Sequence, residues 1–254
     1  MKKKWTKMSR RGGGKNRDCN PPIDGLLLVD KPMGKTSHDL VDVIRRRFKL
    51  LKVGHGGTLD PMATGLLVML LGKGTKSSQQ VMNGNKVYEG RIHFGISTDS
   101  HDKDGKVVEE RDPGNITREM VEAAMAPWNG EVEQIPPMVS AIKKGGQPLY
   151  KLARLGQTVE REARPVTIHK FELLDYQLPV AHIRLGCSKG TYVRTLAHDI
   201  GETLGVGGHL CELRRTHSGE YDVAHALTIE ALEQLDYEGL KEHVLPLPPP
   251  APKA

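Results

Sequence analysis

Two short apolar runs, Gly25–Val29 and Leu66–Leu71, constrain the fold of this chain more than any other feature of its sequence. Each run has no polar interruption and is too short for an ordinary helix, which favours a buried strand. The segment from Tyr88 to Ile96 alternates between apolar and polar residues and predicts a half-buried strand, with Tyr88 at its first inward position. Strands therefore form a substantial part of the predicted core.

Stretches with the period of an α-helix lie between these strands. In the clearest case, a Thr36 or Ser37 N-cap precedes apolar residues at 40, 41, 44 and 48. Further helices are expected near 75 and at 117–126, 148–156, 191–205 and 228–236, and further strands at 166–176, 181–187 and 209–216. Because strands and helices intermix without regular βαβ alternation, we predict an α+β fold with a large mixed, mostly antiparallel sheet flanked by helices.

Basic residues are concentrated at the N-terminus. Residues 1–17 contain eight lysines and arginines and no acid, whereas the rest of the chain has 29 basic and 31 acidic residues. We expect 1–22 to be a disordered basic tail, which either contacts nucleic acid or only adds solubility. The folded domain is expected at 23–220, with a basic insertion rich in glycine and proline at 131–165. A short acidic helix and a Pro-rich end occupy 221–254.

Several common chemistries are excluded by the sequence. No apolar segment reaches the roughly 18 residues that a membrane helix needs, and no secretory signal is visible, so we expect a cytoplasmic protein. The three cysteines lack the spacing of a zinc site or a disulfide framework. The segment 34–36 lacks the earlier glycine of a phosphate-binding loop, and 100–111 lacks the first and last ligands of an EF-hand. We predict no metal and no cofactor.

Three segments remain as a candidate site. They are Gly54–Pro61, Lys86–Tyr88 and Ser188–Arg194. The glycines of the first segment let another molecule approach the backbone, and Pro61 keeps Asp60 extended. The Arg194 guanidinium can keep the Asp60 carboxyl ionised in a dry pocket, and Tyr88 adds an aromatic surface. Taken singly, each segment is compatible with an ordinary turn, a core residue or a solvated charge. Together they predict a pocket built from a carboxylate, a guanidinium and an aromatic ring.

In this order the three segments resemble the TruB family of tRNA pseudouridine synthases. Further matching motifs are Leu26–Gly34, Pro61–Gly65, Gln134–Ala141, Arg161–Pro165 and Leu213–Arg215. The resemblance covers about residues 23–220 and implies a pseudouridine synthase fold. It also implies an isomerase that converts uridine to pseudouridine at position 55 of the tRNA T-loop. Many family members carry a C-terminal PUA domain, for which 221–254 is too short, so we expect recognition of the T-arm alone.

The resemblance implies a role for each matching residue. Asp60 is the expected nucleophile, acting at the sugar C1′ or within a glycal route. Tyr88 packs on the target base and is a candidate for proton transfer, and Arg194 pairs with Asp60. His55 lies near the flipped-out nucleotide, and Leu213 forms an apolar wall. The basic residues expected to bind substrate, or in the case of Lys31 to support the active-site loop, are Lys31, Lys86, Lys143, Lys144 and Arg154.

The chemistry agrees with this interpretation. Isomerising a glycoside at one carbon needs a nucleophile, and a base that leaves its stack needs an aromatic platform. The expected partner is tRNA, clamped by the 131–165 insertion, with no membrane and no obligatory protein partner, and we expect a monomer. Two alternatives stay open. One is an RNA-folding chaperone that binds tRNA without chemistry. The other is a guide-RNA-dependent catalytic subunit related to dyskerin, which shares the aspartate motif.

Overall fold

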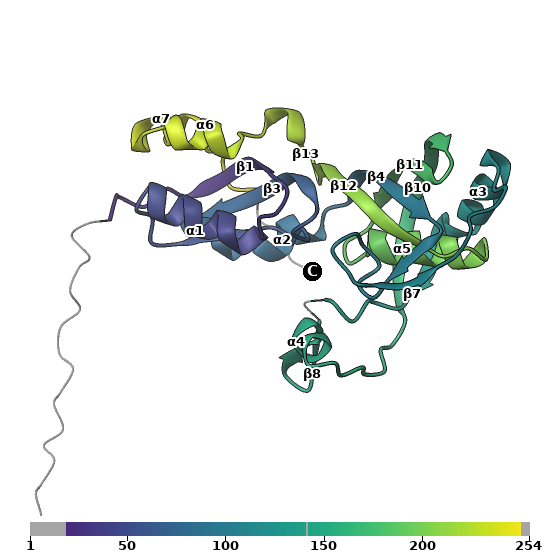
Figure 1. Ribbon diagram of the computed structural model, residues 1–254. Helices are drawn as coiled ribbons and strands as arrows, with labels where there is room; N and C mark the ends of the chain where they lie inside the picture. Colours follow the sequence, from purple (N-terminus) through teal and green to yellow (C-terminus); the bar gives the residue numbers. More distant parts are fainter. Residues whose placement is uncertain (1–18, 141, 250–254) are drawn as a thin grey trace, which may run out of the picture.

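The computed structural model describes residues 19–140 and 142–249, with the backbone alone at Lys144 and Arg154. A nine-stranded sheet with the order β1-β3-β12-β4-β11-β10-β7 runs through the molecule, with β2 added on β3 and β13 on β12 (Figure 1). Its strands are β1 (Gly25–Lys31), β2 (Val53–His55), β3 (Thr64–Leu71), β4 (Lys86–Phe94), β7 (Gly130–Gln134), β10 (Arg164–Gln177), β11 (Val180–Cys187), β12 (Gly208–Ser218) and β13 (Tyr221–Asp222). β12 pairs with β3 in parallel and the other neighbours are antiparallel, which confirms the predicted mixed, mostly antiparallel sheet.

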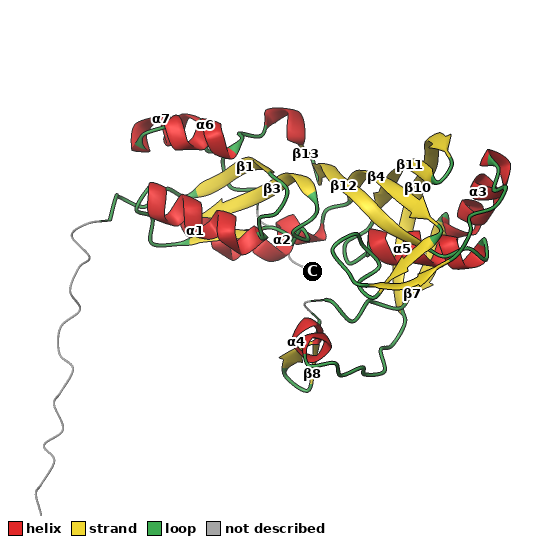
Figure 2. Cartoon of the chain, in the orientation of Figure 1, coloured by secondary structure: helices red, strands yellow, loops and turns green. Residues whose placement is uncertain are grey.

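Helices cover the two halves of this sheet separately (Figure 2). The helices are α1 (Ser37–Arg47), α2 (Ser78–Asn83), α3 (Arg118–Met125), α4 (Leu149–Arg154), α5 (Val193–Thr203), α6 (Ile229–Gln234) and α7 (Tyr237–Glu242). Two small hairpins consist of β5 (Ile96–Thr98) with β6 (Val107–Glu110), and β8 (Lys143–Lys144) with β9 (Gln147–Pro148). In Figure 1 the half with α1, α2, α6 and α7 lies on one side, and the half with α3 and α5 lies on the other. No helix of the described segments is long and apolar enough to span a membrane.

The two apolar runs form neighbouring strands that are buried on both faces. One face of β1 and β3 packs against α1 and against Leu232 and Leu240 from the C-terminal helices. The other face packs against Val81 of α2 and the segment around Tyr221. A strand covered on both sides has no solvent-facing positions, so its residues need not alternate. The uninterrupted run Leu66–Leu71 is therefore explained by this double coverage.

The alternating segment forms β4 and behaves as the pattern predicts. Ile92 and Phe94 are fully buried, while Arg91, which precedes Ile92 in the strand, is exposed. Gly95, with φ of 90°, ends the strand, and the chain continues as β5. The helix predicted at 228–236 is shorter than expected, because α6 ends at Gln234 and a second helix, α7, begins with an Asp236 cap.

The insertion is narrower than the predicted 131–165. Strand β7 and the first residues of β10 pair with each other in the main sheet, with Gln134 opposite Arg164. The chain therefore leaves the sheet only between 135 and 163. We call residues 135–163 the excursion. It contains α4 and the β8–β9 hairpin, which lie below the body of the molecule in Figure 1. Strand β7 is short and mostly polar and exposed, so no local pattern marked it as part of the sheet.

The packing of β3 against β12 tolerates no side chain at Gly65. A Cβ there would collide with the backbone oxygen of Arg215, and the residue has φ of 98°. We expect Gly65→Ala to lower the free energy of unfolding by about 3 kcal/mol or more, because backbone strain and overpacking add. Gly114→Ala is the matched control, since that residue also has positive φ but open space around it, and should cost only about 1–2 kcal/mol. Urea unfolding measures both, and equal losses would contradict the explanation by close approach.

Candidate functional site

Asp60 lies on a loop between β2 and β3 that is held in place by buried polar side chains. Ser37, the first residue of α1, accepts from the Leu59 amide at 2.9 Å and donates to the Leu59 carbonyl at 3.2 Å. From the opposite side, the buried Arg215 guanidinium donates to the carbonyls of Gly57 and Thr58 at 3.2 and 3.4 Å. Both flanks of the loop are therefore fixed before any substrate arrives.

Lys31 supports the same loop and does not face a cavity. It is fully buried, and its Nζ donates to the carbonyls of Pro32, Lys35 and Pro61 at 2.9, 2.6 and 3.2 Å. Burial lowers its pKa to about 8, and the nearby Asp60 carboxylate opposes that shift. Because its three protons already have protein acceptors, these contacts favour the role of supporting the active-site loop over substrate binding.

Lys86 is buried in the same way at the start of β4. Its Nζ donates to the carbonyls of Met82 and Gly84 at the end of α2, and burial lowers its pKa to about 8. A cation at this position satisfies carbonyls at the helix C-terminus. Lys86 also borders the cavity described below, so it contributes positive charge there.

Arg194, in the first turn of α5, makes the central ion pair. Its Nε lies 2.9 Å from Asp60 Oδ2, while its Nη1 and Nη2 donate to the carbonyls of Ser100 and Val139 at 3.0 and 2.5 Å. The guanidinium is almost wholly buried, whereas 37% of the Asp60 side chain is exposed. Asp60 is thus aligned by a fixed cation and still open to a reactant, as the sequence interpretation expected.

A second carboxylate, that of Asp102, lies near the same nitrogen of the Arg194 guanidinium. Its Oδ2 is 3.8 Å from Arg194 Nε, and its Oδ1 accepts from the Ser100 hydroxyl at 2.6 Å. Burial raises the pKa of Asp102, and the Ser100 hydrogen bond and Arg194 oppose that shift. The segment around it is a turn between β5 and β6, as expected. However, no local pattern indicated that this aspartate points inward.

Tyr88 and Leu213 line the cavity into which Asp60 points. This cavity of about 490 Å³ also contains Tyr192 and Arg194 on its walls. Burial raises the pKa of the Tyr88 hydroxyl, with Arg215 acting in the opposite direction. The structure thereby brings together three segments that are far apart in sequence, and it places the aromatic ring, the apolar wall and the carboxylate around one space.

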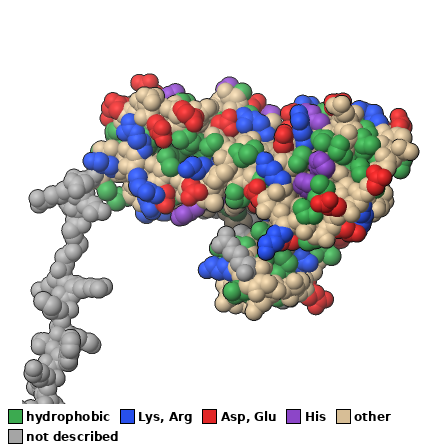
Figure 3. Space-filling view, in the orientation of Figure 1, with side chains coloured by type: hydrophobic (Ala, Val, Ile, Leu, Met, Phe, Trp, Pro, Cys, Tyr) green, Lys and Arg blue, Asp and Glu red, His purple; other side chains and the backbone are tan. Residues whose placement is uncertain are grey.

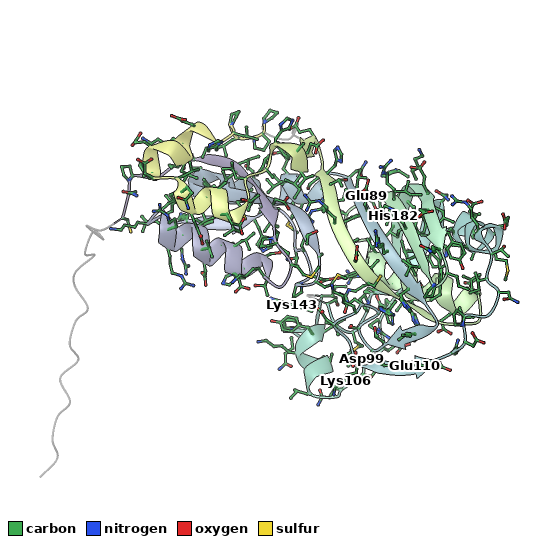
Figure 4. All side chains as sticks on the ribbon, turned by 45° about the horizontal axis from the view of Figure 1, so that its top comes forward. Glu89, Asp99, Lys106, Glu110, Lys143 and His182 are labelled. Atoms are coloured by element: carbon green, nitrogen blue, oxygen red, sulfur yellow. The ribbon has the colours of Figure 1, made fainter. Side chains whose placement is uncertain are left out.

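A larger cavity of about 910 Å³ is also lined by Asp60. It is bordered by His55, by Asp99 and Lys106 of the loop after β5, and by the end of α4. Figure 4 shows Asp99 and Lys106 close to α4. Burial lowers the pKa of His55, so its ring is neutral at physiological pH. The excursion 135–163 therefore forms one wall of an open space beside Asp60.

The remaining predicted substrate-binding residues lie on the excursion. Lys143 is exposed on β8, and Figure 4 shows it on the excursion near α4. The side chains of Lys144 and Arg154 lie outside the described part of the structure. In Figure 3 basic and acidic side chains are interspersed over the body, in agreement with the nearly balanced charge of residues 18–254.

Four residues of the site were not singled out from the sequence. They are Asp102, Gln134, Tyr192 and Arg215. Three of them lie inside the matching motifs, so their position in a motif was a signal of importance, but not of a particular contact. Within 19–140 and 142–249, no three histidine, cysteine or acidic side chains are grouped as a metal site would require.

Comparison with protein families identifies the class. Residues 45–193 match the family described as TruB family pseudouridylate synthase, N-terminal domain. Residues 194–248 match the tRNA pseudouridylate synthase B C-terminal domain. The chain therefore belongs to the TruB family of pseudouridylate synthases, which confirms the resemblance drawn from the motifs.

Individual relatives agree with this assignment. The chain is 48% identical over 230 residues to tRNA pseudouridine synthase B of Opitutus terrae, covering 91% of this chain and 95% of that protein. It is 51% identical to the enzyme of the same name from Aromatoleum aromaticum, covering 85% of this chain and 70% of that protein. Among solved structures, a Cbf5–Nop10–Gar1 complex contains a chain that superimposes with a TM-score of 0.70 at 28% identity, covering 92% of this chain and 66% of that one.

The loop that carries Asp102 and Ser100 also contains a partly buried histidine. His101 has φ of 65°, and its ring stacks on His198 of α5 with centroids 4.0 Å apart. Burial lowers the pKa of His101 to about 3, and the nearby His198 and Arg194 add to this effect. The folded protein therefore excludes a proton that the unfolded chain binds below about pH 6.5.

This difference predicts acid lability at the site. As the pH falls from 7 to 5, wild type should lose about 1–2 kcal/mol of unfolding free energy through this histidine. His101→Asn, which tolerates positive φ, should lose correspondingly less. The control is His169→Asn on the exposed part of β10, which should behave as wild type. Urea unfolding at both pH values measures the difference, and an identical loss in all three proteins would refute it.

Proposed function

We propose that this protein converts a uridine of tRNA to pseudouridine, at position 55 of the T-loop, with Asp60 as the nucleophile. The observation that carries the proposal is the Asp60–Arg194 pair of 2.9 Å at the edge of a cavity that also contains Tyr88. The relatives named tRNA pseudouridine synthase B support the substrate.

The proposed reaction assigns one task to each group. Asp60 attacks the flipped-out nucleotide while the N-glycosidic bond breaks. The freed uracil then turns and its C5 bonds to the sugar as Asp60 is released, and C5 loses its proton while N1 gains one. Arg194 keeps the carboxylate ionised and oriented for this attack. Tyr88 stacks on the base, and burial raises the pKa of its hydroxyl. It is the candidate for proton transfer late in the reaction, when C5 loses a proton and N1 gains one. Leu213 excludes water from the turning base.

The excursion 135–163 is the proposed RNA clamp. It borders the larger cavity beside Asp60, and Lys143 on its hairpin is exposed and can bind phosphates. We propose that the T-arm occupies this cavity while the target base enters the smaller one. Asp60, Tyr88 and Arg194 all come from one chain, and we propose that a monomer carries out the reaction without an obligatory protein partner. The proposed location is the cytoplasm.

A guide-RNA-dependent subunit is the less favoured function. A solved structure of an H/ACA RNP bound to a substrate RNA contains a chain that superimposes with a TM-score of 0.66 at 25% identity. The relatives named tRNA pseudouridine synthase B reach 48% and 51% identity over most of the chain. The higher identity favours direct action on tRNA.

Asp60→Asn tests the proposed nucleophile. Purified protein is incubated with an unmodified tRNA transcript, and pseudouridine is mapped along the RNA. We expect a loss of product at position 55 of at least about a thousandfold, since the nucleophile is removed, with tRNA affinity retained. Asp175→Asn, on the exposed part of β10, should keep full activity. An active Asp60→Asn protein, or wild type that modifies no uridine at position 55, would disprove the assignment.

The basic segment 1–17 lies outside the described residues, and its charge alone supports a prediction. Its eight basic side chains should neutralise additional phosphates, so removing it should weaken tRNA binding. The salt dependence, as log K against log salt concentration, should become shallower by roughly 0.7–0.9 for each phosphate that is no longer neutralised. A variant with these eight residues changed to glutamine keeps the length and should behave like the truncation. Unchanged affinity and slope would show that the segment only adds solubility.

A further inference from the structure

Gln134, the last residue of β7, makes an unusual pair of hydrogen bonds with one distant residue. The residue is 2% exposed. Its Nε2 donates to the Tyr192 carbonyl at 3.0 Å, and its Oε1 accepts from the Tyr192 amide at 2.8 Å. The two residues are 58 positions apart. One side-chain amide thus satisfies both backbone groups of a single residue, as an antiparallel strand neighbour would.

The backbone of Tyr192 is not capped by its own side chain. Tyr192 is the N-cap of α5, with φ of −100° and ψ of 103°, and its side chain makes no capping hydrogen bond. A tyrosine cannot cap in the way that serine, threonine or aspartate does. Its carbonyl accepts from the amides of Thr195 and Leu196 at 3.2 and 3.3 Å, so the first turn of α5 begins from this carbonyl. The Gln134 amide therefore sets where the helix starts.

The first turn of α5 carries Arg194. Its guanidinium lies 5.5 Å from the centre of the Tyr192 ring, and both side chains line the cavity that contains Tyr88. The guanidinium also donates to the Val139 carbonyl, five residues after Gln134. The segment 134–139 thus holds the start of α5 at two points, one on the backbone and one on the Arg194 guanidinium.

We propose that Gln134 is a positioning residue for the Asp60–Arg194 pair. By fixing the Tyr192 backbone, it sets the direction from which the Arg194 guanidinium meets Asp60, and it links that direction to the root of the excursion 135–163. A shift of about 1 Å in such a pair is enough to reduce a rate strongly while binding persists. The inference rests on the proposed uridine isomerisation for its assay.

Two substitutions separate this role from a general loss of stability. Gln134→Glu keeps the shape and the acceptor, but when ionised it has no proton for the Tyr192 carbonyl. When protonated it has both a donor and an acceptor, as the amide does. Gln134→Met has a similar volume and lacks both groups at every pH. Gln177→Glu, at the exposed end of β10, is the control for the added charge.

The experiment measures the single-turnover rate and the KM for tRNA from pH 5.5 to about 8.5. Each rate is divided by the amount of folded protein, which urea unfolding determines. At about pH 8 we expect both Gln134 variants to lose roughly tenfold or more in rate with KM nearly unchanged. The rate of Gln134→Glu relative to wild type should recover as the pH falls, because burial raises the pKa of the new carboxyl and it becomes a donor. Gln134→Met should show no recovery, and Gln177→Glu should match wild type.

Several results would overturn the inference. Wild-type rates in both Gln134 variants would show that the amide does not position the pair, and so would a change in KM alone. The inference would also fail if the rate of Gln134→Glu relative to wild type did not change with pH while the protein stayed folded. Inactivity of wild type itself would instead refute the proposed function, so the two failures are distinguishable.

Discussion

The buried Arg194 guanidinium is the interaction on which the rest of the site depends. It joins the Asp60 loop, the turn after β5, the root of the excursion and the start of α5 through Asp60, Ser100 and Val139. A buried cation is costly unless its donors are satisfied, and here two carbonyls and a carboxylate share that task. Its geometry is therefore fixed by four segments at once, and Asp60, the exposed partner, takes its orientation from it.

Other buried cations hold the backbone around this pair. Lys31, Lys86 and Arg215 donate to main-chain carbonyls, and none of them has a carboxylate as a hydrogen-bond partner among the described residues. Most of the accepting carbonyls lie in loops or at the end of α2, where carbonyls have no regular partners, and the Leu66 carbonyl of β3 also accepts from Arg215. The consequence for function is a region of positive charge around a cavity in which Asp60 is the exposed anion.

Much of the fold was predictable from local patterns, and the failures have physical causes. The alternation in β4 and the Thr36 cap of α1 appear as expected, because each depends on residues close in sequence. The predicted limits of the excursion were wrong, because β7 belongs to the sheet only through pairing with β10, which follows it after the whole excursion. Asp102 was dismissed as a polar turn, since nothing local distinguishes an aspartate that faces solvent from one beneath a guanidinium.

The sequence by itself determined the long strands of the sheet, most helix starts, and the identity of the groups proposed to do chemistry. Apolar periodicity, capping residues and the ordered motifs around Asp60, Tyr88 and Arg194 are local properties, and they can be recognised along the chain alone. Only the tertiary structure decided which charges are buried and what they contact. Hydrogen-bond geometry between distant segments, such as Gln134 with Tyr192, follows from how the sheet and helices pack, and no spacing along the chain encodes it.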